Sequence, residues 1–166
     1  MTLRPPAHDP AHFRKVLGSF PTGVTVVSAV NDGKPVGLAI GSFTSVSLDP
    51  PLVAFLPAKS STSWPAIKKA GAFCVNVMAE DQLEVTGVFA SKAEDKFAGV
   101  EWEPCEATGS PRIIGCTAWM DCTIEQIHEA GDHWIVIGRV EEMDVESRDA
   151  IGPLLFFAGG YGKFTS

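Results

Sequence analysis

The feature that most constrains the fold is a run of β-branched residues that ends in a tight-turn sequence. Residues 24–30 read VTVVSAV, and Asn31-Asp32-Gly33 follows directly. β-Branched side chains favour strands, and Asp-Gly is typical of short hairpin turns. The run therefore predicts a β-hairpin whose second strand starts near Pro35.

The rest of the chain repeats this pattern of short apolar runs between turns rich in Gly and Pro. Strands are expected at residues 42–48, 52–56, 72–78, 118–127, 134–145 and 154–157. Short helices are expected at residues 64–70 and 80–90, after a first helix that begins at Asp9-Pro10 and ends by Gly18. Many short strands and a few short helices indicate a mainly β fold of the barrel or sandwich type. Residues 1–166 fit a single domain.

Charge and hydropathy exclude several kinds of partner. The chain has 13 Lys and Arg against 20 Asp and Glu, a formal net charge of −7, without a basic cluster. Nucleic acid and anionic membranes are therefore not expected as partners. No stretch approaches the ~20 apolar residues of a membrane span. Residues 1–10 contain no apolar run of the kind found in signal peptides, so the expected location is the cytoplasm.

The cysteines do not have the spacing of a metal or redox site. Cys74, Cys105, Cys116 and Cys122 form no CxxC pair, which argues against a zinc ribbon or a thioredoxin-type motif. Cys116 and Cys122 fall on one expected strand, and six residues of straight strand span about 20 Å, too far for a disulfide. We expect buried free thiols and no metal site.

Three stretches carry residues suited to ligand binding. In residues 37–47, glycines let a flat ligand approach the backbone and hydroxyls two apart share one face, although an edge strand with a polar outer face explains this pattern better. Residues 59–63 combine one Lys with four hydroxyls before a helix, which suits a phosphate; simple helix capping is an equal alternative. Gly131-Asp132-His133 is a tight turn that places a titratable ring at the head of a strand. The alternative is that His133 is an ordinary surface histidine without a role in binding. The GxGxxG and P-loop motifs are absent.

Together these stretches resemble the flavin reductase-like family, the small reductase components of two-component flavin-dependent monooxygenases. The matching segments are residues 20–29, 42–55, 73–82, 95–102, 131–133 and 153–162. They cover nearly the whole chain in the order that the family has them. Within the family, SWPAI, SKAEDKFAG and CTIEQIHEAGDH are most similar to the branch that serves the actinobacterial steroid seco-ring hydroxylase.

The resemblance implies an FMN-binding split β-barrel, usually a homodimer with flavin near the dimer interface. It implies NAD(P)H-dependent reduction of FMN or FAD, with NADH or NADPH as hydride donor and an oxygenase component as the recipient of reduced flavin. It implies that His133 contacts the nicotinamide cofactor, and we take this histidine as the catalytic residue. The residues implied for the flavin ring and ribityl chain are Ala39, Ile40, Gly41, Ser42, Phe43, Ser45 and Val46. The residues implied for the phosphate side are Ser60, Ser61, Thr62, Ser63, Ser91 and Lys92, with Lys59, Phe97 and Tyr161 as further cofactor contacts.

Two other functions fit the same fold: a non-catalytic flavin carrier or sensor, and a split-barrel oxidase of another substrate, such as a pyridoxamine-type phosphate. The Gly131-Asp132-His133 turn favours the reductase. Residues 134–137 and 154–157 are apolar on both faces, which suggests burial against a second subunit and hence a homodimer. No Arg cluster near Gly131 is visible to hold a 2′-phosphate, which favours NADH over NADPH.

Overall fold

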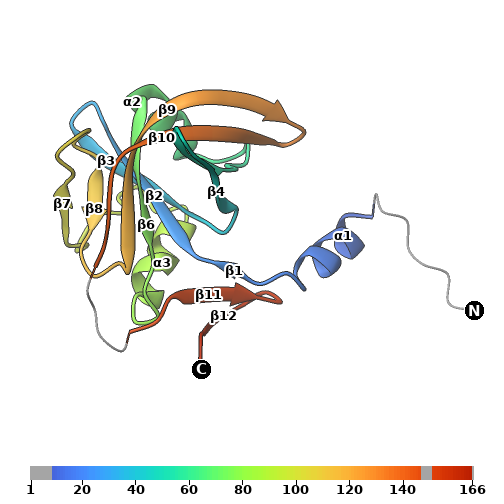
Figure 1. The fold of residues 1–166 in the computed structure, drawn as a ribbon. Coiled ribbons are helices and arrows are strands. Elements are labelled where there is room, and N and C mark those ends of the chain that lie inside the picture. Colours follow the sequence, from blue (N-terminus) through green and yellow to red (C-terminus); the bar gives the residue numbers. More distant parts are fainter. Residues whose placement is uncertain (1–8, 147–150, 166) are drawn as a thin grey trace, which may run out of the picture.

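The structure is a computed structural model of the chain that describes residues 9–146 and 151–165 (Figure 1). The strands are β1 (Thr22–Gly23), β2 (Thr25–Asn31), β3 (Lys34–Ile40), β4 (Phe43–Leu48), β5 (Pro51–Phe55), β6 (Ala72–Val77), β7 (Trp102–Pro104), β8 (Pro111–Ile113), β9 (Ala118–Ala130), β10 (His133–Val145), β11 (Leu154–Phe157) and β12 (Gly160–Lys163). The helices in these ranges are α1 (Pro10–Leu17), α2 (Trp64–Ala70) and α3 (Leu83–Ala90). The expectation of a mainly β fold with short helices is confirmed.

The predicted hairpin forms as β2 and β3. Their antiparallel register pairs Asn31 with Lys34, which leaves Asp32 and Gly33 as a two-residue turn. Both turn residues have positive φ, 51° and 77°. Type I′ turns require this conformation, and their twist matches that of the flanking strands.

The large sheet rolls up because its two edge strands are neighbours in the chain. The strand order is β3-β2-β6-β9-β10-β5-β4, so β3 and β4 lie at opposite edges. Only Gly41 and Ser42 connect the end of β3 to the start of β4. Such a short link forces the two edges together at that end, while no ladder joins them further along. This arrangement is a split barrel, as expected.

The barrel interior is filled by side chains from nearly every strand of the large sheet. Phe55, Phe73 and Val136 are completely buried there, and α2 adds Trp64 and Ile67 at one side. The rings of Phe55 and Phe73 pack edge to face, with centroids 5.0 Å apart. Full burial of such side chains stabilises the fold by about 1.5–3 kcal/mol each.

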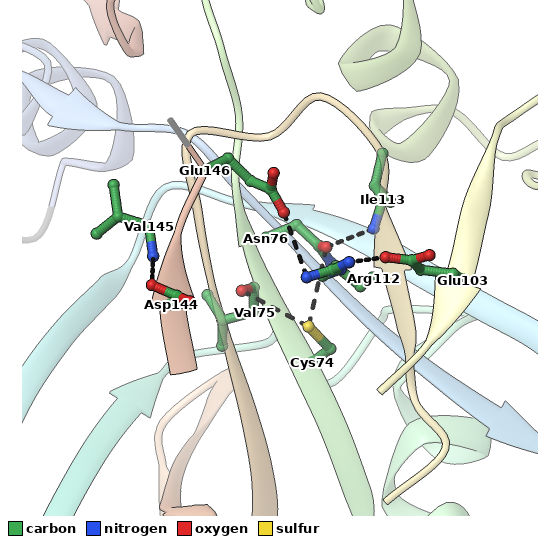
Figure 2. A network of polar contacts seen from close by, with 9 residues as sticks. All are labelled: Cys74, Val75, Asn76, Glu103, Arg112, Ile113, Asp144, Val145 and Glu146. Carbon is green, nitrogen blue, oxygen red and sulfur yellow. Dashed lines mark hydrogen bonds and ion pairs between the residues drawn. The ribbon is translucent and has the colours of Figure 1, made fainter. Parts of the chain in front are cut away.

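The hairpin β7-β8 is attached to the outside of β6 by a polar network (Figure 2). The Ile113 backbone N–H donates to Asn76 Oδ1 over 2.7 Å. Arg112 forms ion pairs with Glu103 and with Glu146, the latter over 3.3 Å between Nη1 and Oε1. The network satisfies the buried Asn76 amide, which would otherwise cost stability.

The structure differs from the sequence expectations at short or polar elements. The helix expected at residues 80–90 begins only at Leu83, and of its three expected core contacts Phe89 is buried, whereas Leu83 and Val88 are 45% and 36% exposed. Strands β1, β7, β8 and β12 were not expected because they have two to four residues and include Gly or Pro. Cys116 precedes β9 rather than lying on it. All four cysteines are free and buried, as expected.

Helix α1 and the small sheet β1-β11-β12 lie beside the barrel. The Asp9 carboxylate caps α1 by accepting from the Ala11 N–H over 2.9 Å, which confirms the predicted helix start. No residue of α1 is buried, and Figure 1 shows the helix standing away from the other elements. None of the helices in the described ranges is long and apolar enough to span a membrane.

Candidate functional site

The first predicted stretch lies where the barrel edges meet. Ser42 Oγ donates to the Leu56 carbonyl over 3.1 Å and accepts from the Leu56 N–H over 3.2 Å. Ile40 is buried, and Phe43 is half-buried and packs against the barrel core. Ala39 is half-buried and packs against a separate core cluster that includes Met78 and Phe89, whereas Ile40 belongs to the barrel core.

Strand β4 is the edge strand that the pattern of hydroxyls also suggested. Its residues are mostly exposed, including Ser45 and Val46. The register between β4 and β5 shifts between Ser45 and Ser47, so Val46 is an extra residue in a β-bulge. Bulges are frequent beside active sites, where they re-aim a side chain. Gly41, Ser45 and Val46 therefore offer an accessible surface at the barrel edge.

The second and third stretches lie side by side. The Lys59 N–H donates to the Asp132 carbonyl over 2.9 Å, and the Trp134 N–H donates to the Pro57 carbonyl over 3.0 Å. Ala58 and His133 form a bridge between these bonds. The start of the hydroxyl-rich loop is thus fixed to the turn that carries His133, although the two segments are far apart in the sequence.

A cavity of about 350 Å³ opens at the far end of this loop, between β3, α2 and the segment after α3. Its lining residues are Pro35, Val36, Gly37, Thr62, Ser63, Ala66, Lys92, Ala93, Glu94 and Lys96. Three of the residues predicted for the phosphate side are among them, namely Thr62, Ser63 and Lys92. The cavity combines hydroxyls with two ammonium groups, a donor set suited to an anionic oxygen.

The other residues predicted for the phosphate side do not line this cavity. Ser61 Oγ accepts from the Trp64 N–H over 3.2 Å, which is the capping alternative. Ser91 Oγ donates to the Val88 carbonyl over 2.7 Å at the end of α3. Ser60 is exposed. The Lys59 ammonium pairs with Glu129 and lies 5.3 Å from the centroid of the Trp134 ring.

Sequence reasoning missed Lys96, which lines the cavity. Its Nζ donates to Ser63 Oγ over 3.2 Å and to the Phe89 carbonyl over 3.0 Å. Burial lowers the pKa of Lys96 because the charged form loses hydration. The only sequence signal was the motif DKFAG, whose Lys stands 33 residues from Ser63.

His133 is held by its neighbour at the start of β10. Its Nδ1 lies 2.7 Å from Asp132 Oδ1, and its side chain is 44% exposed. The hydrogen bond to His133 is the main cause of the lowered pKa of Asp132. An ionised carboxylate can only accept, so Nδ1 carries a proton. The opposite nitrogen, Nε2, has no partner in the part of the chain that is described, and it can contact a ligand.

Two predicted cofactor contacts lie apart from the cavity. Phe97 is buried and packs edge to face against Phe89, with centroids 5.0 Å apart, so its side chain belongs to a core cluster. Tyr161 lies on β12, half-exposed, with its ring 5.2 Å from that of Phe156. Within one chain, neither side chain joins Thr62, Ser63 and Lys92.

Comparison with models of known protein families identifies the family of this chain. The flavin reductase-like domain matches residues 17–165. The chain belongs to the flavin reductase-like family. The resemblance inferred from the motifs is thereby confirmed. Solved structures similar to this flavin reductase-like chain are also of the split-barrel type.

Curated relatives agree with this assignment. The chain is 58% identical over 161 residues to a flavin reductase of Pseudomonas putida, covering 96% of this chain and 93% of the relative. It is 49% identical over 155 residues to the reductase subunit HsaB of a flavin-dependent monooxygenase from Rhodococcus jostii, covering 93% and 78%.

Solved structures of family members superpose closely. Nitrilotriacetate monooxygenase component B from Mycobacterium thermoresistibile gives a TM-score of 0.91 at 47% identity, covering 96% of this chain and 88% of that one. The NADH:FAD oxidoreductase SgcE6 of Streptomyces globisporus, in complex with NAD and FAD fragments, gives 0.90 at 34% identity, covering 99% and 98%.

Proposed function

We propose that this protein is an NAD(P)H:flavin oxidoreductase that reduces FMN or FAD and supplies the reduced flavin to a partner monooxygenase. The observation that carries the proposal is that one loop, residues 59–63, joins the His133 turn to the cavity. Its start is bonded to the His133 turn, and its end lines the cavity with Thr62 and Ser63. The match to the flavin reductase-like family over residues 17–165 indicates that the chemistry at this place is flavin reduction.

The chain's own groups fit binding and orientation. Bound flavin supplies a ring that accepts hydride from the nicotinamide, so no protein nucleophile is required. Gly41 and the bulge at Val46 leave accessible backbone for a flat ring at the barrel edge. The hydroxyls and lysines of the cavity suit the phosphate side. His133, fixed by Asp132, is placed to hydrogen-bond the nicotinamide cofactor through Nε2.

A homodimer belongs to the proposal, because the described chain leaves large apolar side chains exposed. On α1 and just after it, Phe13, Val16, Leu17 and Phe20 are 51–70% exposed. Exposed apolar patches of this kind mark interaction surfaces. Of the two runs that suggested a dimer, residues 154–157 expose Phe156 and Phe157, whereas residues 134–137 are at most half-exposed.

The cytoplasm is the proposed location, since free thiols persist in a reducing compartment, and all four cysteines are free. An oxygenase component is the proposed recipient of the product. Curated relatives include reductase subunits named for the N-demethylation of stachydrine and for the monooxygenation of trigonelline.

Mixing the protein with NADH and free FMN tests the function directly. A flavin reductase consumes NADH catalytically, which is followed as loss of the NADH absorbance band, and each turnover delivers one reduced flavin. A carrier or sensor of the same fold binds FMN with no NADH loss beyond the uncatalysed rate. A split-barrel oxidase consumes oxygen with its own substrate and leaves NADH unchanged, so either of these results contradicts the proposal.

A further inference from the structure

A separate cavity, of about 210 Å³, lies where the hairpin β7-β8 meets the long strands β9 and β10. We call it the outer cavity. Its walls come from β7 and the residues just after it, from β8, and from Trp119 of β9 and Glu142 of β10. None of its residues lines the cavity beside α2, and none was implied for flavin or nicotinamide. The outer cavity therefore has no part in the proposed function.

Two buried polar atoms at the outer cavity lack a hydrogen-bond partner. They are the indole Nε1 of Trp119, a residue that is only 6% exposed, and Oε2 of Glu142; neither has a partner within residues 9–146 and 151–165. The register pairs Trp119 with Asp144 and Asp121 with Glu142, so Trp119 and Glu142 are diagonal neighbours on one face of the sheet. One atom is a donor and the other an acceptor, so a single ligand can satisfy both.

Carboxylates outnumber cations around the outer cavity. Its lining includes Glu103, Glu106 and Glu142, and Arg112 is the one basic residue among the described lining residues. The Arg112 guanidinium is already shared between Glu103 and Glu146 (Figure 2). In the part of the chain that is described, no Lys or Arg pairs with Glu106 or Glu142. The excess of negative charge favours a positively charged ligand.

Water alone does not meet these demands. A bridging water could accept from the Trp119 indole and donate to Glu142, but it carries no charge, and the cavity is several times larger than the ~30 Å³ that one water occupies in the liquid. An ammonium group carries a charge and three donors. A carboxylate turns about its terminal torsion at little cost, so Glu142 can present either oxygen to such a group.

We propose that the outer cavity binds a small primary ammonium compound that also carries a hydroxyl or carbonyl oxygen. The ammonium group donates to the Glu142 carboxylate, and the indole N–H of Trp119 donates to the oxygen of the ligand. Arg112, whose guanidinium carbon lies 4.9 Å from the centroid of the Trp119 ring, forms a wall of the site and stays with its two glutamates. This site is additional to flavin reduction and does not depend on it.

The indole N–H of Trp119 is itself the probe for the test. The chain has four tryptophans, so ¹H–¹⁵N NMR shows few indole signals, and Trp119→Phe identifies the one that belongs to Trp119. In an amine-free buffer, ethanolamine should shift this signal saturably, with a dissociation constant on the order of 1 mM for so small a ligand. Ethylamine lacks the oxygen and choline lacks the N–H donors, so each should bind more weakly by about fivefold or more.

Glu142→Gln should weaken ethanolamine by about tenfold, because it removes the charge that the ammonium group meets. Glu141→Gln is the matched control: this exposed neighbour accepts from the Thr123 hydroxyl, and its replacement should leave the constant unchanged. Choline binding as well as ethanolamine, or an unchanged constant in Glu142→Gln, would overturn the proposal. The absence of a saturable shift would show that the cavity holds water only. If Glu142→Gln does not fold, the comparison of the three amines on wild type still decides.

The measurement uses no flavin and no NADH, so its outcome is independent of the proposed function.

Discussion

Removing the His133 imidazole should weaken nicotinamide binding far more than it slows the hydride step. The ring is already oriented, because Nδ1 donates to Asp132 over 2.7 Å, and only Nε2 is free for a ligand. One neutral hydrogen bond of about 1 kcal/mol corresponds to roughly fivefold in affinity, and a charge-assisted one to somewhat more. We therefore expect His133→Ala to raise the KM for NADH by about tenfold, with a smaller fall in kcat.

Steady-state kinetics at saturating FMN measure both parameters. The affinity for FMN should stay nearly unchanged, since His133 does not line the cavity. Asp132→Ala should raise the KM for NADH by a smaller factor, because the ring remains but is no longer held. His128→Ala is the matched control: this histidine is exposed on the adjacent strand, and its side chain hydrogen-bonds Gln126. A thousandfold fall in kcat at unchanged KM would show that His133 acts as an acid or base, for which losses of about 10²–10⁴ are usual.

Four further results are expected. Replacing Ser61 and Thr62 together by Ala should weaken FMN more than riboflavin, as titrations of both ligands would show. NADH should be used more efficiently than NADPH, because Arg139, the nearest Arg in sequence, is paired with a glutamate; comparable kcat/KM values would reject this. Gly138→Ala should destabilise the protein by about 1–3 kcal/mol in denaturant unfolding, because a Cβ there would lie 2.4 Å from the buried Phe73 ring. Light scattering at micromolar concentration should give twice the chain mass, and a monomer that still binds flavin would contradict the dimer.

The sequence predicted those elements whose local signals agree with their packing. The hairpin of β2 and β3 has β-branched strands and a turn that tolerates positive φ, so local preference and fold coincide. Gly71 ends α2 with φ of 74°, as its position predicted. The start of α3 was misplaced because residues 80–82 look helical, yet Gln82 turns its side chain to the Ala79 N–H and the Ile114 carbonyl. That tertiary contact is not visible in a local pattern.

The candidate site was predicted as a set of segments and could not be predicted as a set of contacts. The hydroxyl-rich loop and the histidine turn were both identified, but their direct pairing depends on β5 and β9 flanking β10 in the sheet. Only that order places Lys59 N–H within 2.9 Å of the Asp132 carbonyl. A two-residue turn joins β9 to β10, but a long stretch of chain separates β5 from β10, so sequence order does not reveal that β5 and β10 are neighbours.

Lys59 and Lys96 show why proximity in sequence is a poor guide to which charged side chain lines a cavity. Lys59 adjoins the hydroxyls, but the bond from its N–H to Asp132 directs that residue toward the His133 turn, and its ammonium meets Glu129 there. Lys96 is distant in sequence, yet the carbonyl of Phe89 and the oxygen of Ser63 hold its ammonium at the cavity. A lysine already neutralised by a carboxylate gains little from a second anion, whereas an unpaired, partly dehydrated one gains most. The loop of residues 59–63 is thus bonded to the His133 turn at its start and lines the cavity with Thr62 and Ser63 at its end.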